Sequence, residues 1–118
     1  MPLEGNHYSD RRKFARMDFR EPVSLKVADD HHGSGCLSRD LCEGGLRVNH
    51  EHFVKPNTPT AVEFRLRPSD EPMLIKGRVA WAHQMPSSDR YQLGIEFTEN
   101  SEEHQKNIRS HVLSNQLR

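Results

Sequence analysis

Residues 73–97 read MLIKGRVAWAHQMPSSDRYQLGIEF, and apolar residues alternate with polar ones at both ends of this stretch. An alternation with a period of two is typical of a β-strand that buries one face. The turn-forming run Pro86-Ser87-Ser88-Asp89 separates the two alternating halves. The stretch therefore predicts an antiparallel hairpin. One side of its first strand carries Ile75, Gly77, Val79 and Trp81, and one side of its second strand carries Tyr91, Leu93, Ile95 and Phe97.

Shorter runs with the same period precede this hairpin, and turn signals such as Glu43-Gly44-Gly45 separate them. These runs are Val23, Leu25 and Val27; Leu46 and Val48; and Val62, Phe64 and Leu66. Short strands at this spacing favour a small antiparallel β-barrel or β-sandwich.

The apolar period changes after residue 100. Asn100 or Ser101 suits the N-cap of a helix, and Ile108, Val112 and Leu117 form a narrow apolar stripe at helical spacing. We expect one C-terminal helix, over about 101–117, that packs against the barrel or closes one end of it.

The length and the charge limit the classes of function. The chain has 118 residues, with 17 lysines and arginines against 17 aspartates and glutamates. This length suits one small domain, and zero net charge gives no whole-molecule attraction to a nucleic acid polymer or to a lipid surface. No apolar run approaches the ~20 residues of a membrane span, and the first residues do not resemble a signal peptide. We therefore predict a cytoplasmic protein without membrane insertion.

One segment departs from this neutral balance. Residues 11–20 contain five basic residues and one acidic residue, which gives a local net charge of +4. The preceding residues 1–10 have little apolar content and predict a flexible tail. We divide the single domain, 11–118, into a basic arm over 11–20, a barrel over about 21–98 and the helix over about 101–117.

Two motifs together identify a family. The first is Arg11-Arg12-Lys13-Phe14-Ala15-Arg16, and the second is Asp40-Leu41-Cys42-Glu43-Gly44-Gly45-Leu46-Arg47-Val48. The pair resembles the RxxxR and (D/N)xSxxG motifs of PilZ domains, and the similarity extends over roughly residues 11–117. The resemblance implies a mainly β fold, a six-stranded antiparallel PilZ-like barrel with a C-terminal α-helix, and a bacterial receptor for the second messenger cyclic di-GMP.

The resemblance assigns ligand-binding roles to seven residues. Arg11, Arg12 and Arg16 would contact phosphate and guanine, because a guanidinium can donate two hydrogen bonds to either and can also stack on a base. Asp40 would accept hydrogen bonds from the guanine N–H groups, and Gly45 would let the ligand approach the backbone. Trp81 offers a flat surface for a base. Cys42 occupies the position of the motif serine, and since a thiol is a weaker hydrogen-bonding group we expect weakened binding rather than none.

Other interpretations of these residues stay open. A degenerate PilZ adaptor that acts only through protein contacts is the alternative function, and Asp40 and Trp81 then have structural roles in a turn and in the core. Cys36 and Cys42, expected on one face of the same strand, are predicted to be free thiols in a reducing compartment. The histidines and cysteines fit no common metal spacing, and no nucleophile pairs with a base, so we predict neither a metal site, nor a cofactor, nor an enzyme. The expected partners are cyclic di-GMP and an unidentified effector protein.

Overall fold

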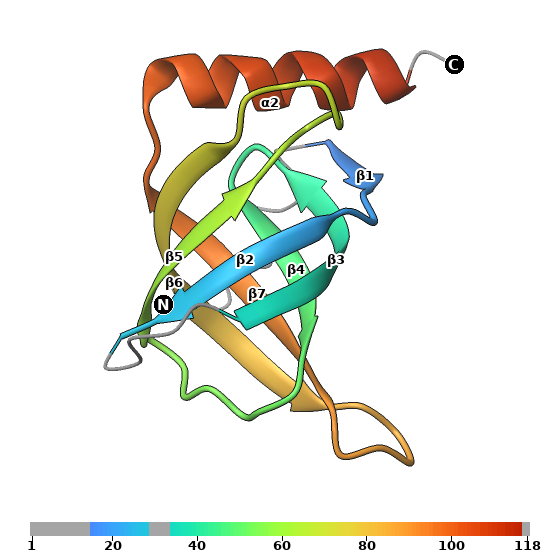
Figure 1. The fold of residues 1–118 in the computed structure, drawn as a ribbon, viewed down its shortest axis with the longest axis vertical. Coiled ribbons are helices and arrows are strands. Elements are labelled where there is room, and N and C mark those ends of the chain that lie inside the picture. Colours follow the sequence, from blue (N-terminus) through green and yellow to red (C-terminus); the bar gives the residue numbers. More distant parts are fainter. Residues whose placement is uncertain (1–14, 29–33, 117–118) are drawn as a thin grey trace, which may run out of the picture.

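The computed structural model describes residues 15–28 and 34–116, which form a β-sheet and one long helix (Figure 1). The elements in chain order are β1 (Arg16–Asp18), β2 (Pro22–Val27), β3 (Ser34–Cys42), β4 (Gly45–His50), β5 (Pro59–Phe64), β6 (Met73–Gln84), β7 (Tyr91–Glu99) and α2 (Glu102–Gln116).

The sheet closes into a barrel because β3 pairs on both sides. The strand order is β1-β3-β2-β5-β6-β7-β4, and an additional pairing between β3 and β4 closes the six strands from β3 to β4 into a ring. All pairings are antiparallel. Six strands form the closed barrel, and β1 is an extra strand on the second half of β3. This confirms the predicted fold class, including the hairpin of β6 and β7.

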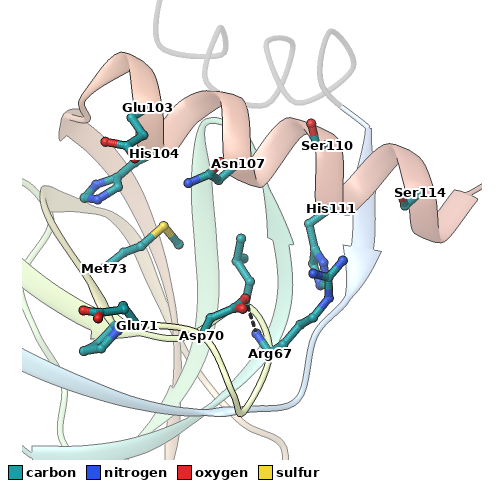
Figure 2. Close-up of a pocket in the computed structure, with 12 residues that line it drawn as sticks. Arg67, Asp70, Glu71, Met73, Glu103, His104, Asn107, Ser110, His111 and Ser114 are labelled. Carbon is teal, nitrogen blue, oxygen red and sulfur yellow. Dashed lines mark hydrogen bonds between the residues drawn. The ribbon is translucent and has the colours of Figure 1, made fainter.

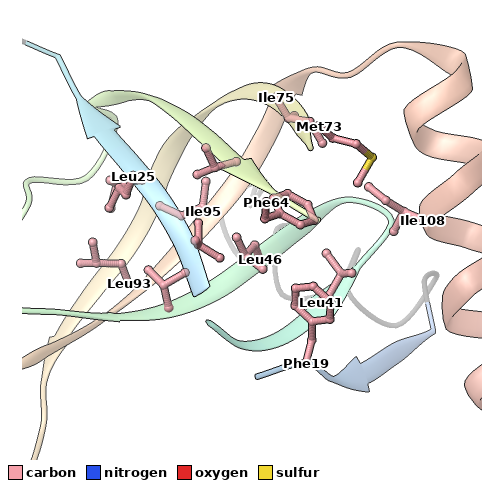
Figure 3. Close-up of a cluster of buried hydrophobic side chains, with 14 of the residues drawn as sticks. Phe19, Leu25, Leu41, Leu46, Phe64, Met73, Ile75, Leu93, Ile95 and Ile108 are labelled. Carbon is pink, nitrogen blue, oxygen red and sulfur yellow. The ribbon is translucent and has the colours of Figure 1, made fainter. Parts of the chain in front are cut away.

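The core follows the predicted alternation. Leu25, Val62, Ile75 and Leu93 are fully buried inside the barrel, as their period-two spacing requires. Figure 3 shows Leu25, Ile75 and Leu93 in the barrel interior, together with Phe19 and Leu41 towards the end near the helix. The sequence did not single out β1, which lies within the predicted arm, because three residues are too few for a recognisable alternation.

The helix α2 lies across one end of the barrel (Figure 1). Ser101 is its N-cap, since the Ser101 hydroxyl accepts a hydrogen bond from the His104 backbone N–H at 3.1 Å. Ile108 and Val112 are buried against the core, as the predicted stripe requires; Leu117 lies outside the described residues. No helix in residues 15–28 and 34–116 has the length and apolar character of a membrane span.

Two β-bulges overturn two predictions of side-chain direction. In β6 the register shifts between Val79 and Trp81. Val79 and Ala82 therefore pack in or against the core, whereas Trp81 does not point inward on the same side as Val79. In β3 the register shifts at Arg39. Cys36 therefore packs against the core while Cys42 points outward, contrary to the prediction that both lie on one face.

Candidate functional site

The second motif projects its polar side chains from the outer surface of the barrel. Leu41 in β3 and Leu46 in β4 point into the core. Because side chains alternate along a strand, their neighbours Asp40, Cys42 and Arg47 point outward. Strand pairing then aligns one residue from each of five strands across this surface. We call them the central row; its members are Asp18, Asp40, Arg47, Gly94 and Trp81.

Asp40 is the centre of an ion-pair cluster in this row. Its Oδ1 atom accepts from Arg16 Nε at 3.1 Å and lies 2.9 Å from Arg16 Nη2, while Oδ2 pairs with Arg47. The Asp40 side chain is only 10% exposed, so the cluster compensates a nearly buried carboxylate with two guanidinium groups. The sequence predicted that Arg16 and Asp40 belong to one site, and the fold brings them into direct contact across β1 and β3.

Cys42 joins the same cluster through its sulfur. The Arg16 Nη1 atom donates to the Cys42 Sγ atom at 3.2 Å, and Arg16 and Cys42 are Cα partners in the register of β1 and β3. Cys42 therefore helps to orient Arg16, and it is a free thiol like Cys36. Burial raises the pKa of the Cys36 thiol to about 11, although Arg90 lowers it in part, so Cys36 stays protonated at neutral pH.

Gly45 is required by the backbone at the start of β4. It pairs with Cys42 on one side and with Glu96 on the other, and a Cβ at this position would overlap the Ile95 carbonyl oxygen. The third motif residue therefore permits the close approach of β4 to β7, which supports the outer surface beside Asp40.

Trp81 reaches this surface because of the bulge in β6. It pairs with Gly94 in the register of β6 and β7 and is partly buried. The His83 ring lies beside it, with 4.9 Å between ring centroids. The other two predicted ligand residues, Arg11 and Arg12, lie outside the described residues, as does the predicted tail over 1–10.

Arg47 belongs to the cluster, although it is not one of the seven predicted ligand residues. It contacts Asp40 and donates to the Gln92 side chain at 3.5 Å. The sequence could have predicted this position. Arg47 comes two residues after Gly45 in an alternating strand, and residues two apart lie on the same face.

The turn between β3 and β4 is tied to the helix. Arg109 Nε and Nη2 donate to the two carboxylate oxygens of Glu43 at 3.0 and 2.8 Å. The hydrogen bonds from Arg109 hold the pKa of Glu43 below its usual value, against a smaller opposing effect of burial. The second motif and α2 are thereby linked by a bidentate ion pair.

A separate cavity of about 450 Å³ lies between α2 and the loop from β5 to β6 (Figure 2). Its lining includes Arg67, Asp70, Glu103, His104 and His111 but none of the predicted ligand residues. Within the described part of the chain, no three histidine, cysteine or acidic side chains are arranged to hold a metal ion. The outer surface around Asp40 is therefore the candidate site.

The fold and this surface define a small β-barrel domain that presents a charged site on its outside rather than in its interior. The chain belongs to the PilZ domain family, which matches residues 10–114. PilZ domains are ligand-binding adaptor domains and not enzymes. No curated protein matches the chain.

Several solved structures share the fold. The Bacillus subtilis inhibitor of motility MotI/DgrA is 19% identical with a TM-score of 0.76, and the match covers 91% of this chain and 52% of that one. The PilZ domain of Escherichia coli YcgR with c-di-GMP is 14% identical with a TM-score of 0.69, covering 91% and 92%. The K. pneumonia MrkH–c-di-GMP complex is 14% identical with a TM-score of 0.70, covering 91% and 53%. The chain thus spans about half the length of two of these proteins.

Proposed function

We propose that this protein is a cyclic di-GMP receptor that signals to a partner protein in trans. The observation that carries the proposal is the cluster of Arg16, Asp40 and Cys42, in which the two motifs meet on the outer surface of the barrel. Similar PilZ structures of YcgR and MrkH contain c-di-GMP, which supports the same ligand class here.

The cluster has the groups that a guanine dinucleotide requires. Arg16 and Arg47 supply two guanidinium forks for phosphate or for the guanine O6 and N7 atoms. Asp40 supplies a carboxylate for the guanine N1–H and N2–H groups. Because Arg16 and Arg47 both contact Asp40, binding would exchange at least one of these ion pairs for contacts with the ligand.

The signal would arise from the basic segment that precedes β1. Arg11 and Arg12 would join Arg16 on the phosphates and bases. Because Arg16–Asp18 already form β1, ligand binding would order only the part of the predicted arm that precedes β1, and would thereby change the surface offered to an effector. The proposal includes a cytoplasmic location and no catalytic step; two free thiols favour a reducing compartment.

The test is calorimetric titration of the intact chain with cyclic di-GMP, with GTP and cyclic di-AMP as controls. We expect saturable binding of the guanine dinucleotide alone. The Arg12→Ala, Arg16→Ala double variant should lose at least about 100-fold in affinity, since a hydrogen bond to a charged group contributes about 1.5–3 kcal/mol. The matched control is Lys13→Ala, a basic residue of the same stretch, which should lose less.

Two results would contradict the proposal. Unchanged affinity in the double arginine variant would show that the site lies elsewhere. The absence of heat and of any thermal shift with wild-type protein would favour the degenerate adaptor, and the Cys42→Ser variant in the same experiment would show whether the thiol is the reason.

A further inference from the structure

The strands β1 and β2 run one after the other along the same edge of β3. The last pair of β1 joins Asp18 to Asp40. The first pair of β2 joins Pro22 to Leu37. Between these pairs, the three residues 19–21 face only two residues of β3. This segment, which we call the β1–β2 junction, therefore departs from regular strand pairing and needs other contacts to hold it.

The side chain of Ser38 supplies these contacts. Its Oγ atom accepts a hydrogen bond from the Glu21 backbone N–H at 2.9 Å. Its single proton faces two carbonyl oxygens, that of Phe19 at 2.7 Å and that of Glu21 at 2.9 Å. The Ser38 backbone N–H also donates to the Glu21 carbonyl oxygen at 3.1 Å. Ser38 is 0% exposed, so bulk water does not replace these hydrogen bonds when the hydroxyl is lost.

Phe19 anchors the same junction in the core. Its ring packs edge-to-face against the rings of Phe64 and of His111 in α2, with 5.8 and 6.4 Å between centroids. Its backbone N–H donates to the Arg39 carbonyl oxygen at 3.0 Å. The junction is thus held by a buried ring and a buried hydroxyl, and β1 extends from this fixed point.

The position of Arg16 depends on this fixed point. Arg16 lies three residues before Phe19, and its guanidinium contacts Asp40 and Cys42 across the pairing of β1 with β3. With three residues, β1 forms few ladder hydrogen bonds of its own. A slip of β1 by one residue would turn Arg16 to the opposite face of the sheet.

We propose that Ser38, which belongs to neither motif, is a positioning residue for ligand binding. By fixing the β1–β2 junction, it holds β1 in the register that presents Arg16 beside Asp40. The inference rests on the proposed function and extends it by placing at Phe19 the boundary between the ligand-responsive segment and the fixed barrel. Only molecules with β1 in this register can use Arg16, so losing the Ser38 hydroxyl lowers the apparent affinity by the fraction of molecules that leave it.

The experiment compares Ser38→Ala with Thr60→Val, since both remove one buried hydroxyl from the barrel. The Thr60 hydroxyl has no hydrogen-bond partner among residues 15–28 and 34–116. Ser38→Ala should speed hydrogen exchange of the Phe19 amide, which donates to β3, and leave the Val79 amide, which donates to the loop before β5, protected. Its affinity for cyclic di-GMP, measured by calorimetry, should fall about threefold to tenfold. Thr60→Val should change neither value.

A double-mutant cycle separates positioning from a general loss of barrel stability. If Ser38 acts through Arg16, then Ser38→Ala should cost little further affinity in an Arg16→Ala background. If Ser38→Ala does not fold, Ser38→Cys replaces it in every comparison, because a thiol keeps a weaker hydrogen-bonding group of similar size. The expected losses are then smaller.

Three results would overturn the inference while wild-type binding still supports the proposed function. They are wild-type affinity in the Ser38 variant, additive losses in the cycle, and an equal loss of protection at the Phe19 and Val79 amides. The absence of cyclic di-GMP binding by the wild-type chain would instead overturn the proposed function, and this inference with it.

Discussion

The sulfur atom of Cys42 takes part in the hydrogen bonding of the candidate site. It accepts a hydrogen bond from Arg16 at 3.2 Å, which a thiol does weakly, whereas the hydroxyl of the motif serine is a good donor and a good acceptor. The position is 3% exposed, so its hydrogen bonds are not replaced by bulk water. The identity of this residue should therefore affect ligand affinity more than it affects folding.

We expect Cys42→Ser to bind cyclic di-GMP about threefold to tenfold more tightly than the wild type, since one neutral hydrogen bond contributes about 0.5–1.5 kcal/mol. Calorimetry measures this change directly. Cys36→Ser is the control, because Cys36 lies on the same strand but packs against the core. Equal or weaker binding by Cys42→Ser would show that the sulfur contact with Arg16 suits the ligand as well as a hydroxyl does.

At the scale of elements, α2 is connected to the strands that carry the site. It contacts β1 and β3, which hold Arg16, Asp40 and Cys42, and Arg109 binds Glu43 in the turn that follows β3. If ligand binding displaced this turn, the ion pair between Glu43 and Arg109 would transmit the displacement directly to the helix. The exposed side of α2 is then a second surface, besides the basic arm, that could change with the ligand.

We expect Arg109→Ala to reduce the protection of the Ile108 and Val112 amides against hydrogen exchange, while the barrel amides keep theirs. Lys106→Ala, at an exposed position of the same helix, is the control. The ion pair lowers the pKa of Glu43 in the folded state. Its contribution to the free energy of unfolding is therefore present above the unfolded pKa of about 4.5, and it is lost as the pH falls through the folded pKa. The difference between Arg109→Ala and wild type should thus disappear at acid pH; a difference that persists there would assign it to packing of the arginine stem.

The elements also show how far the sequence predicts this fold. Alternation gave β2, β4, β5, β6 and β7 because each buries one face over a regular run. It failed at Trp81 and at Cys42 for one physical reason: a β-bulge inserts one residue and reverses the alternation beyond it, and single residues such as Arg39 and Ala80 give no signal for a bulge. The two motifs predicted that Arg16 and Asp40 belong to one site. The position of the Trp81 indole against Gly94 could not be predicted in this way, because it depends on the register between β6 and β7.

At the scale of the whole molecule, the central row crosses five strands of the barrel, from β1 through β3, β4 and β7 to β6. A ligand that contacts this row joins strands that are far apart in sequence, and unfolding would break all these contacts together. The chain has no net charge, so its attraction to a dianion depends on the local cluster of Arg16, Arg47 and the basic segment.

Binding should therefore stabilise the entire domain. At a free ligand concentration of 100 times Kd, a ligand that binds only the folded state adds about 2.7 kcal/mol to the free energy of unfolding. For a domain of this size, that corresponds to a rise in Tm on the order of 10 °C, measured by scanning calorimetry with and without cyclic di-GMP. Added salt should weaken binding and so reduce the rise at a fixed ligand concentration, since the charges lie on the surface. Arg16→Ala should show a much smaller rise under the same conditions, because its weaker binding leaves the ligand at a smaller multiple of Kd. Saturable heat of binding without a change in Tm would mean that the ligand does not contact the folded barrel.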